Sequence, residues 1–186
     1  MTSADERALT CIRVGCQRGV GVSRGAGQHH HAGSRGQDIT GEDTGVVTDI
    51  LDRVLRLWTD PIDDRVDPVG DFRSCYTDPV LVNGVPLTAA DLVNRARATQ
   101  MAYSDLRVEL VHRIETGNKL VIAFLMHGRH TGPVPSALGE VAPTGRRVAI
   151  RTTDVLTVRS GLIEDVWVIA DEMDLLRQLG KVSGAR

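Results

Sequence analysis

The sequence has 186 residues, of which 41% are hydrophobic and 25% charged, and its formal net charge is −2. These values are typical of a globular domain with its own core. The sequence has no excess of basic residues that would attract nucleic acid, and it has no apolar run long enough to span a membrane. We therefore expect a soluble, cytoplasmic protein whose partner is a small molecule, with neither nucleic acid nor a membrane as a partner.

Residues 1–45 differ in composition from the rest of the chain, with many glycines and arginines, three histidines at 29–31 and almost no aliphatic periodicity. This composition predicts a disordered tail, and a wrongly assigned upstream start codon would also explain it. Cys11 and Cys16 precede the histidines at a spacing similar to that of a zinc finger, but the second histidine at the required spacing and the finger's apolar residues are missing. We expect no metal site here.

A helical pattern begins at Val46, where aliphatic side chains recur every three or four residues as far as Trp58. The stretch "PIDDRVDP" that follows is rich in proline and aspartate, which favours a solvated loop over a metal site. Beyond it we expect a short helix ending near Tyr76 and a brief extended segment. Thr88 and Asp91 have the spacing of a capping box and predict the start of another helix.

After that helix the hydrophobic period changes to that of strands. Residues 106–115 alternate between apolar and polar, which predicts a strand with one wet face that carries a solvated His112. Residues 119–127 are apolar on both faces and predict a central strand. The segment 132–145 contains too much proline and glycine for us to expect a regular element there.

The C-terminal part of the sequence predicts a hairpin and a final helix. Residues 146–159 and 162–171 flank the turn Ser160-Gly161, and residues 172–180 have a helical pattern that ends at a glycine. Helices followed by antiparallel strands and a last helix indicate an α+β fold, with helices over one face of a curved sheet. The part of the concave face that the helices leave uncovered would form a pocket.

Three segments of the chain resemble one known family. "HGRHTG", "PTGRRV" and "DVLTVRSGLIEDVWVIADEMDLLRQLG" occur in this order and resemble the SnoaL-like polyketide cyclases of the nuclear-transport-factor-2-like superfamily. The resemblance covers about residues 46–180. It implies a cone-shaped α+β barrel, with N-terminal helices packed on a curved, mainly antiparallel sheet, a short C-terminal helix, an apolar pocket and a homodimer. We place this domain at residues 46–182 and expect residues 183–186 to be disordered.

The resemblance also implies a chemistry. Family cyclases close polyketide rings by an intramolecular aldol reaction, in which a pocket carboxylate serves as acid and base and no cofactor takes part. Such a base must lie within hydrogen-bond reach of the carbon acid, and an apolar wall can raise its pKa toward the working pH. The family has a histidine and its catalytic aspartate at the positions of Val166 and Val168. The related limonene epoxide hydrolases also have an essential aspartate at the second position, so both reactions lose a key group here.

Strand alternation leaves Asp154 as the candidate acid and base. Asp154 shares a face with Thr152 and Leu156 and is expected across the hairpin from the two valines, where burial would raise its pKa. An exposed or edge-strand aspartate is the alternative. The predicted substrate-binding residues are Trp58, Thr152, Leu156, Val166 and Val168.

Other polar residues are weaker candidates. His127 and His130 lie at the end of the central strand and are candidates to assist the acid, with a structural role as the alternative. Asp171 precedes the last helix, so we expect it to be an N-cap. Trp167 is expected in the core or in a dimer contact, and Arg151 on the surface or at an interface.

Three functions remain open at this point. The leading one is a SnoaL-like protein with an apolar pocket for a polyketide-like molecule, a divergent cofactor-free cyclase or isomerase that uses Asp154 with help from His127 or His130. The second is a non-catalytic binding module of the same fold, and the third is a regulatory or interaction domain. Residues 46–186 contain no P-loop, dinucleotide fingerprint or metal-ligand cluster, so we expect no cofactor.

Overall fold

The computed structural model describes residues 44–63 and 65–183, and an α+β fold accounts for this part of the chain. Most of the predicted tail, including Cys11 and Cys16, lies outside the described residues, as do residues 184–186. The elements are α1 (Thr44–Thr59), α2 (Pro68–Arg73), β1 (Tyr76–Val82), β2 (Val85–Leu87), α3 (Ala89–Ala102), β3 (Tyr103–Thr116), β4 (Lys119–His130), β5 (Val134–Ser136), β6 (Gly139–Val141), β7 (Arg147–Arg159), β8 (Leu162–Ala170) and α4 (Glu172–Gln178). The predicted order of helices, strands and a last helix is confirmed.

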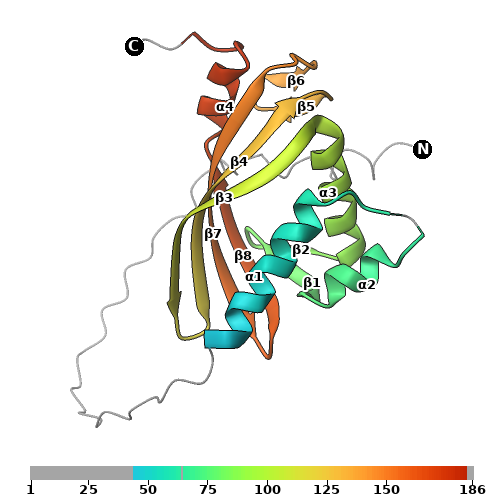
Figure 1. The fold of residues 1–186 in the computed structure, drawn as a ribbon, viewed down its shortest axis with the longest axis vertical. Helices are drawn as coiled ribbons and strands as arrows, with labels where there is room; N and C mark the ends of the chain where they lie inside the picture. The colour runs from blue at the N-terminus through green and yellow to red at the C-terminus, as the bar shows by residue number, and fades with distance from the viewer. Residues whose placement is uncertain (1–43, 64, 184–186) are drawn as a thin grey trace, which may run out of the picture.

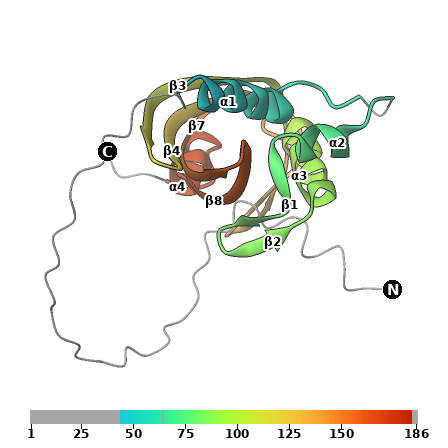
Figure 2. The ribbon, with the colours of Figure 1, turned by 90° about the horizontal axis from the view of Figure 1, so that it is seen from below.

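Six strands form one curved sheet in the order β2-β1-β8-β7-β4-β3, and β5 pairs with β6 in a separate hairpin. All neighbours in the large sheet are antiparallel except β1 and β8. The sheet curls around its concave face, and α1 lies along the open side, where it contacts β3, α2 and α3 (Figures 1 and 2). The expected curved, mainly antiparallel sheet with helices packed on it is therefore confirmed, although the sheet does not close into a complete barrel.

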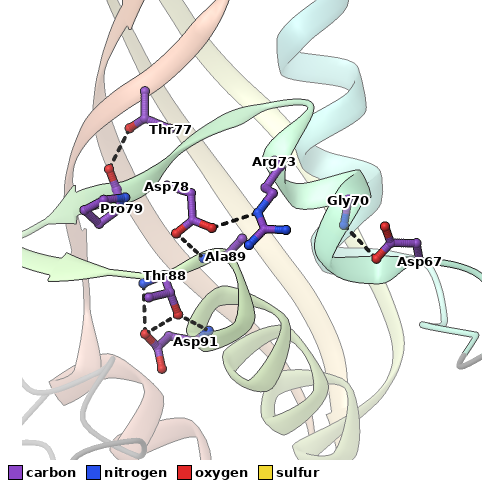
Figure 3. A network of polar contacts seen from close by, with 9 residues as sticks. All are labelled: Asp67, Gly70, Arg73, Thr77, Asp78, Pro79, Thr88, Ala89 and Asp91. Atoms are coloured by element: carbon purple, nitrogen blue, oxygen red, sulfur yellow. Dashed lines mark hydrogen bonds and ion pairs between the residues drawn. The ribbon is translucent and has the colours of Figure 1, made fainter.

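A polar network joins the helices to the start of β1 (Figure 3). The predicted capping box is present, because Thr88 Oγ1 accepts a hydrogen bond from the Asp91 amide and the Asp91 carboxylate accepts one from the Thr88 amide. Asp78 in β1 accepts hydrogen bonds from Nε of Arg73 at 2.8 Å and from the amide of Ala89 at 3.2 Å. One side chain thus ties the end of α2 and the start of α3 to β1.

The buried apolar side chains form two groups at opposite ends of the sheet. The first cluster lies between α1, α2, α3 and the concave face, and its buried members include Ile50, Leu51, Val54, Phe72, Tyr76, Val80, Leu92, Leu120, Ile122, Leu156, Ile163 and Val166. The second cluster lies under α4 and the β5-β6 hairpin and includes Ala102, Tyr103, Val134, Val141, Val148, Ile150, Leu175, Leu176 and Leu179. Burial of this kind stabilises each end by the hydrophobic effect.

The predicted end of the second helix is wrong. The first helix begins at Thr44, two residues before the predicted start of the domain, and α2 ends at Arg73. Tyr76 therefore opens β1, where its ring is buried in the first cluster, instead of ending a helix. Contacts with the sheet decide this conformation, which local sequence pattern does not report.

In the strand region one prediction is corrected and another is narrowed. The segment expected to be irregular contains β5 and β6, and a two-stranded hairpin accommodates Pro135 because one side of each strand needs no partner. Trp167 is 53% exposed on the convex face, which excludes the core and leaves the dimer contact as the remaining one of its two predicted places. The turn predicted at Ser160-Gly161 is confirmed, since both residues have the positive φ angles that a two-residue hairpin turn requires.

Candidate active site

The register of three central strands places Asp154 on the concave face. Asp154 in β7 pairs with Ile122 of β4 on one side and with Val168 of β8 on the other. Directly paired residues point to the same side of a sheet, and Ile122 is only 1% exposed in the first cluster. The Asp154 side chain therefore points toward the helices, and the edge-strand alternative does not hold because β7 lies between two neighbours.

The surroundings of Asp154 are apolar. Leu156 and Val166, the next pair along the same face, are buried, and Val168 is partly buried against the first cluster. Oδ1 of Asp154 is enclosed and has no hydrogen-bond partner among the described residues. Burial raises the pKa of this carboxyl to about 7, because an ionised carboxylate is poorly solvated there. Near neutral pH the group is therefore present both as an acid and as a base.

An aromatic group from α1, α2 and β1 lies in the same cluster. Nε1 of Trp58 donates a hydrogen bond to the hydroxyl oxygen of Tyr76 at 3.1 Å. The ring of Phe72 stacks on Tyr76 and meets Trp58 edge-on, with centroid distances of 6.0 Å in both cases. Burial, and to a smaller extent the charge of Asp154, raise the pKa of Tyr76, which stays protonated at neutral pH.

Sequence reasoning missed Tyr76, because it assigned this residue to the end of a helix. A signal was nevertheless present in the composition, since aromatic residues make up only 3% of the chain. Four of these residues, Trp58, Phe72, Tyr76 and Phe124, lie in or against the first cluster. Three of these scarce aromatic side chains, Trp58, Phe72 and Tyr76, lie within 20 residues of each other in the sequence, and this clustering marked one wall of the interior.

The two candidate histidines lie far from Asp154. Nδ1 of His130 accepts a hydrogen bond from the Thr144 amide at 3.2 Å, and the ring is 0% exposed in the region of the second cluster. Nε2 of His127 lies 2.8 Å from Glu109 on the convex face. His127 and His130 are five and eight residues along β4 from Ile122, the partner of Asp154, which is roughly 17 and 26 Å measured along the strand at ~3.3 Å per residue. The structure does not bring either ring to the acid.

The remaining predicted residues have structural places. Asp171 caps α4, because its side chain accepts a hydrogen bond from the Asp174 amide at 2.9 Å, which confirms the predicted N-cap. Arg151 lies 3.6 Å from Asp171 and is exposed, as is His112. Thr152 is partly buried next to Asp154 on the concave face. These contacts of Asp171 and Arg151 do not include Asp154.

A separate hollow of about 320 Å³ lies between the end of α1, the 60–68 segment and α2. Its lining residues include Arg53, Arg56, Asp60, Phe72 and Cys75, and Asp154 is not among them. The described residues contain no group of three or more potential ligands placed to hold a metal ion. Within the same ranges, no helix is long and apolar enough to cross a membrane.

Comparisons with known proteins support the same fold. Residues 50–179 match the family described as SnoaL-like polyketide cyclase. TsrD from Streptomyces laurentii is 22% identical with a TM-score of 0.64, over 76% of this chain and 100% of that protein. A SnoaL-like polyketide cyclase from Agrobacterium tumefaciens is 17% identical with a TM-score of 0.58, over 76% of this chain and all of the other. No curated protein matches the sequence.

Proposed function

Since the chain belongs to the SnoaL-like polyketide cyclase family, we propose that it binds an apolar, polyketide-like small molecule against the concave face. We propose further that Asp154 is the acid and base of a cofactor-free cyclisation or isomerisation of that molecule, in the cytoplasm and without metal, nucleic acid or membrane. One observation carries the proposal. Asp154 has a pKa of about 7 and stands directly opposite Val168, the position at which the family has its catalytic aspartate.

The pairing with Val168 supports a relocated acid. The Cα atoms of directly paired antiparallel residues are about 5 Å apart, so carboxylates on either residue reach overlapping volumes. A carboxylate at position 154 can therefore approach a ligand that the family binds against position 168. The two histidines play no part in this proposal, because the strand positions keep them at the other end of β4 or on the other face.

The reaction needs only one carboxyl group. The Asp154 carboxylate removes a proton from a carbon next to a ketone, and the electrons of that C–H bond form an enolate. In a cyclisation the enolate carbon attacks a second carbonyl of the same molecule, and the new alkoxide takes the proton back from Asp154. A pKa close to neutral pH suits a group that must both accept and return the proton.

Proton exchange offers a direct test. We expect the protein to catalyse deuterium exchange at the α-carbons of 2-tetralone, measured by NMR in D₂O, and Asp154→Asn to reduce this catalysis by about a hundred-fold or more. The exchanged variant Asp154→Val/Val168→Asp moves the acid to its partner position and should recover part of the rate. Equal exchange by wild type and Asp154→Asn would refute the acid–base role.

A non-catalytic binding module is the second candidate, and the two valines favour it. Val166 and Val168 occupy positions where the family has its proton-moving residues, and no described residue is hydrogen-bonded to Oδ1 of Asp154. Binding of 2-tetralone without exchange above the buffer rate would support this candidate over the first. Titration calorimetry on the same samples separates the two outcomes.

We also propose a homodimer that forms through the convex face of the sheet. Trp167 and Ile169 on β8 are 53% and 65% exposed and lie side by side on this face, which is unusual for large apolar side chains. We expect Trp167→Ser/Ile169→Ser to produce a monomer in sedimentation experiments. Met101→Ser, which changes a residue that is 69% exposed elsewhere, is the control and should leave the dimer intact.

A further inference from the structure

The hydroxyl proton of Tyr76 has no acceptor in the part of the chain that the structure describes. Its only hydrogen-bond partner among the described residues is Nε1 of Trp58, and an indole nitrogen can only donate. The hydroxyl oxygen of Tyr76 therefore acts as an acceptor in this contact, and its own proton has no acceptor among residues 44–63 and 65–183. The side chain is 5% exposed, and a buried donor left unpaired is costly in a protein interior.

The same interior contains the second unpaired group. Oδ1 of Asp154 is enclosed and has no hydrogen-bond partner within the described ranges, and its paired neighbours Ile122 and Val168 belong to or pack against the cluster that contains Tyr76. The charge of Asp154 also acts on the Tyr76 hydroxyl, so the two groups are within electrostatic reach. A donor from β1 and an acid from β7 thus lie at the same apolar cluster, on different strands.

We propose that Tyr76 is a catalytic hydrogen-bond donor that binds the carbonyl oxygen of the substrate while Asp154 takes the proton from the adjacent carbon. This inference rests on the proposed function and narrows the substrate to a ketone with an acidic neighbouring C–H. When the enolate forms, negative charge gathers on the carbonyl oxygen and the hydrogen bond from Tyr76 strengthens. The tyrosine proton itself stays on Tyr76 throughout.

Two neighbours hold Tyr76 in this role. The hydrogen bond from Trp58 restricts rotation of the hydroxyl, and the ring of Phe72, stacked at 6.0 Å, fixes the plane of the phenol. At the C-terminal end of the short helix α2, next to Phe72, Arg73 donates a hydrogen bond to Asp78 of β1, two residues after Tyr76 (Figure 3). Trp58 is therefore a positioning residue, and we expect its loss to weaken the donor without removing it.

Binding of an enolate analogue tests the donor independently of catalysis. The probe is a nitro-substituted 2-naphthol, whose ionised form has its own absorption band, and the matched probe is the nitronaphthalene without the hydroxyl. All measurements use an Asp154→Asn background, so that the charge of the acid plays no part. We expect Tyr76→Phe to weaken naphthol binding by about ten- to hundred-fold, as for one hydrogen bond to a charged oxygen, and to leave nitronaphthalene binding within about twofold.

Two control variants sharpen the result. Tyr103→Phe removes another buried hydroxyl without a partner, in the second cluster, and should leave the binding of both probes unchanged. Trp58→Phe should weaken naphthol binding by less than Tyr76→Phe does. An equal loss for both probes, or no loss for the naphthol, would overturn the donor role while the pocket stands. If neither probe binds to the Asp154→Asn protein that still has Tyr76, the proposed ligand pocket on the concave face is refuted, and the donor role of Tyr76 is refuted with it.

Discussion

The two clusters of the molecule both enclose polar groups without partners, yet they treat these groups differently. In the second cluster His130 is 0% exposed, and the Thr144 amide fixes one ring nitrogen while burial lowers the pKa of the ring, which stays neutral. In the first cluster no described residue donates a hydrogen bond to the enclosed Oδ1 of Asp154, and burial raises the pKa of this carboxyl to about 7. A buried polar side chain held by the backbone serves the fold, whereas one that can change charge near neutral pH is suited to chemistry.

Removal of the histidine should have the largest effect on stability. We expect His130→Ala to lower the free energy of unfolding by about 3 kcal/mol, because it leaves a cavity and an unpaired Thr144 amide in the second cluster. Urea unfolding followed by circular dichroism measures this change. The rate of tetralone exchange per folded molecule should stay within about twofold of wild type. A large loss of the exchange rate in a folded His130→Ala protein would contradict the assignment of a structural role to His130 and a chemical role to Asp154.

The pH dependence of stability should report the buried acid. The carboxyl has a pKa of 3.8 when unfolded and about 7 in the fold, so between these values the folded chain binds more protons and stability falls as pH rises. Asn cannot ionise, and we expect Asp154→Asn to gain about 2 kcal/mol relative to wild type between pH 5 and pH 8.5. Urea unfolding at both pH values gives the difference.

Asp174 provides the control for that experiment. A hydrogen bond from Arg177 lowers the pKa of Asp174, so this carboxylate is ionised at both pH values. Asp174→Asn should therefore change stability by the same amount at pH 5 and at pH 8.5. If Asp154→Asn behaves in this way too, the carboxyl is not held near neutrality by burial.

The smallest effect is expected at Thr144. The hydroxyl of Thr144 lies 3.1 Å from Nδ1 of His130, but the amide of the same residue also donates to that nitrogen. Thr144→Ala keeps the amide, so we expect a loss of only about 0.5 kcal/mol in the free energy of unfolding. Thermal unfolding is sensitive enough to measure it. A loss as large as that of His130→Ala would mean that the side chain, not the backbone, fixes the histidine.

Local sequence signals were sufficient for structures that depend on neighbouring residues in the chain. The Thr88 capping box, the Ser160-Gly161 turn and the Asp171 cap depend on residues within a few positions of each other, and all three were predicted. Alternation along β7 also placed Asp154 on the face that its register with Val168 shows. Alternation of apolar and polar residues predicts the face of a side chain correctly, because successive side chains of a paired strand point to opposite faces of the sheet.

Sequence reasoning failed where contacts between residues far apart in the sequence determine the position of a side chain. No local sequence pattern reports the distance between the candidate histidines and Asp154. Only the pairing of β4 with β7 shows how far along the sheet the histidines lie from the acid. Tyr76 belongs to the site because a helix 18 residues earlier supplies Trp58. Such contacts require the fold itself.

The pairing of Asp154 with Val168 has a consequence for how this family is searched. Column-by-column alignment scores the chain as having lost its acid, because the expected column contains valine. Two positions that face each other across a hairpin offer a carboxylate to nearly the same volume, so two substitutions can transfer an active group between strands while the backbone stays unchanged. Members that look inactive should be surveyed by register pairs, with both positions counted as one.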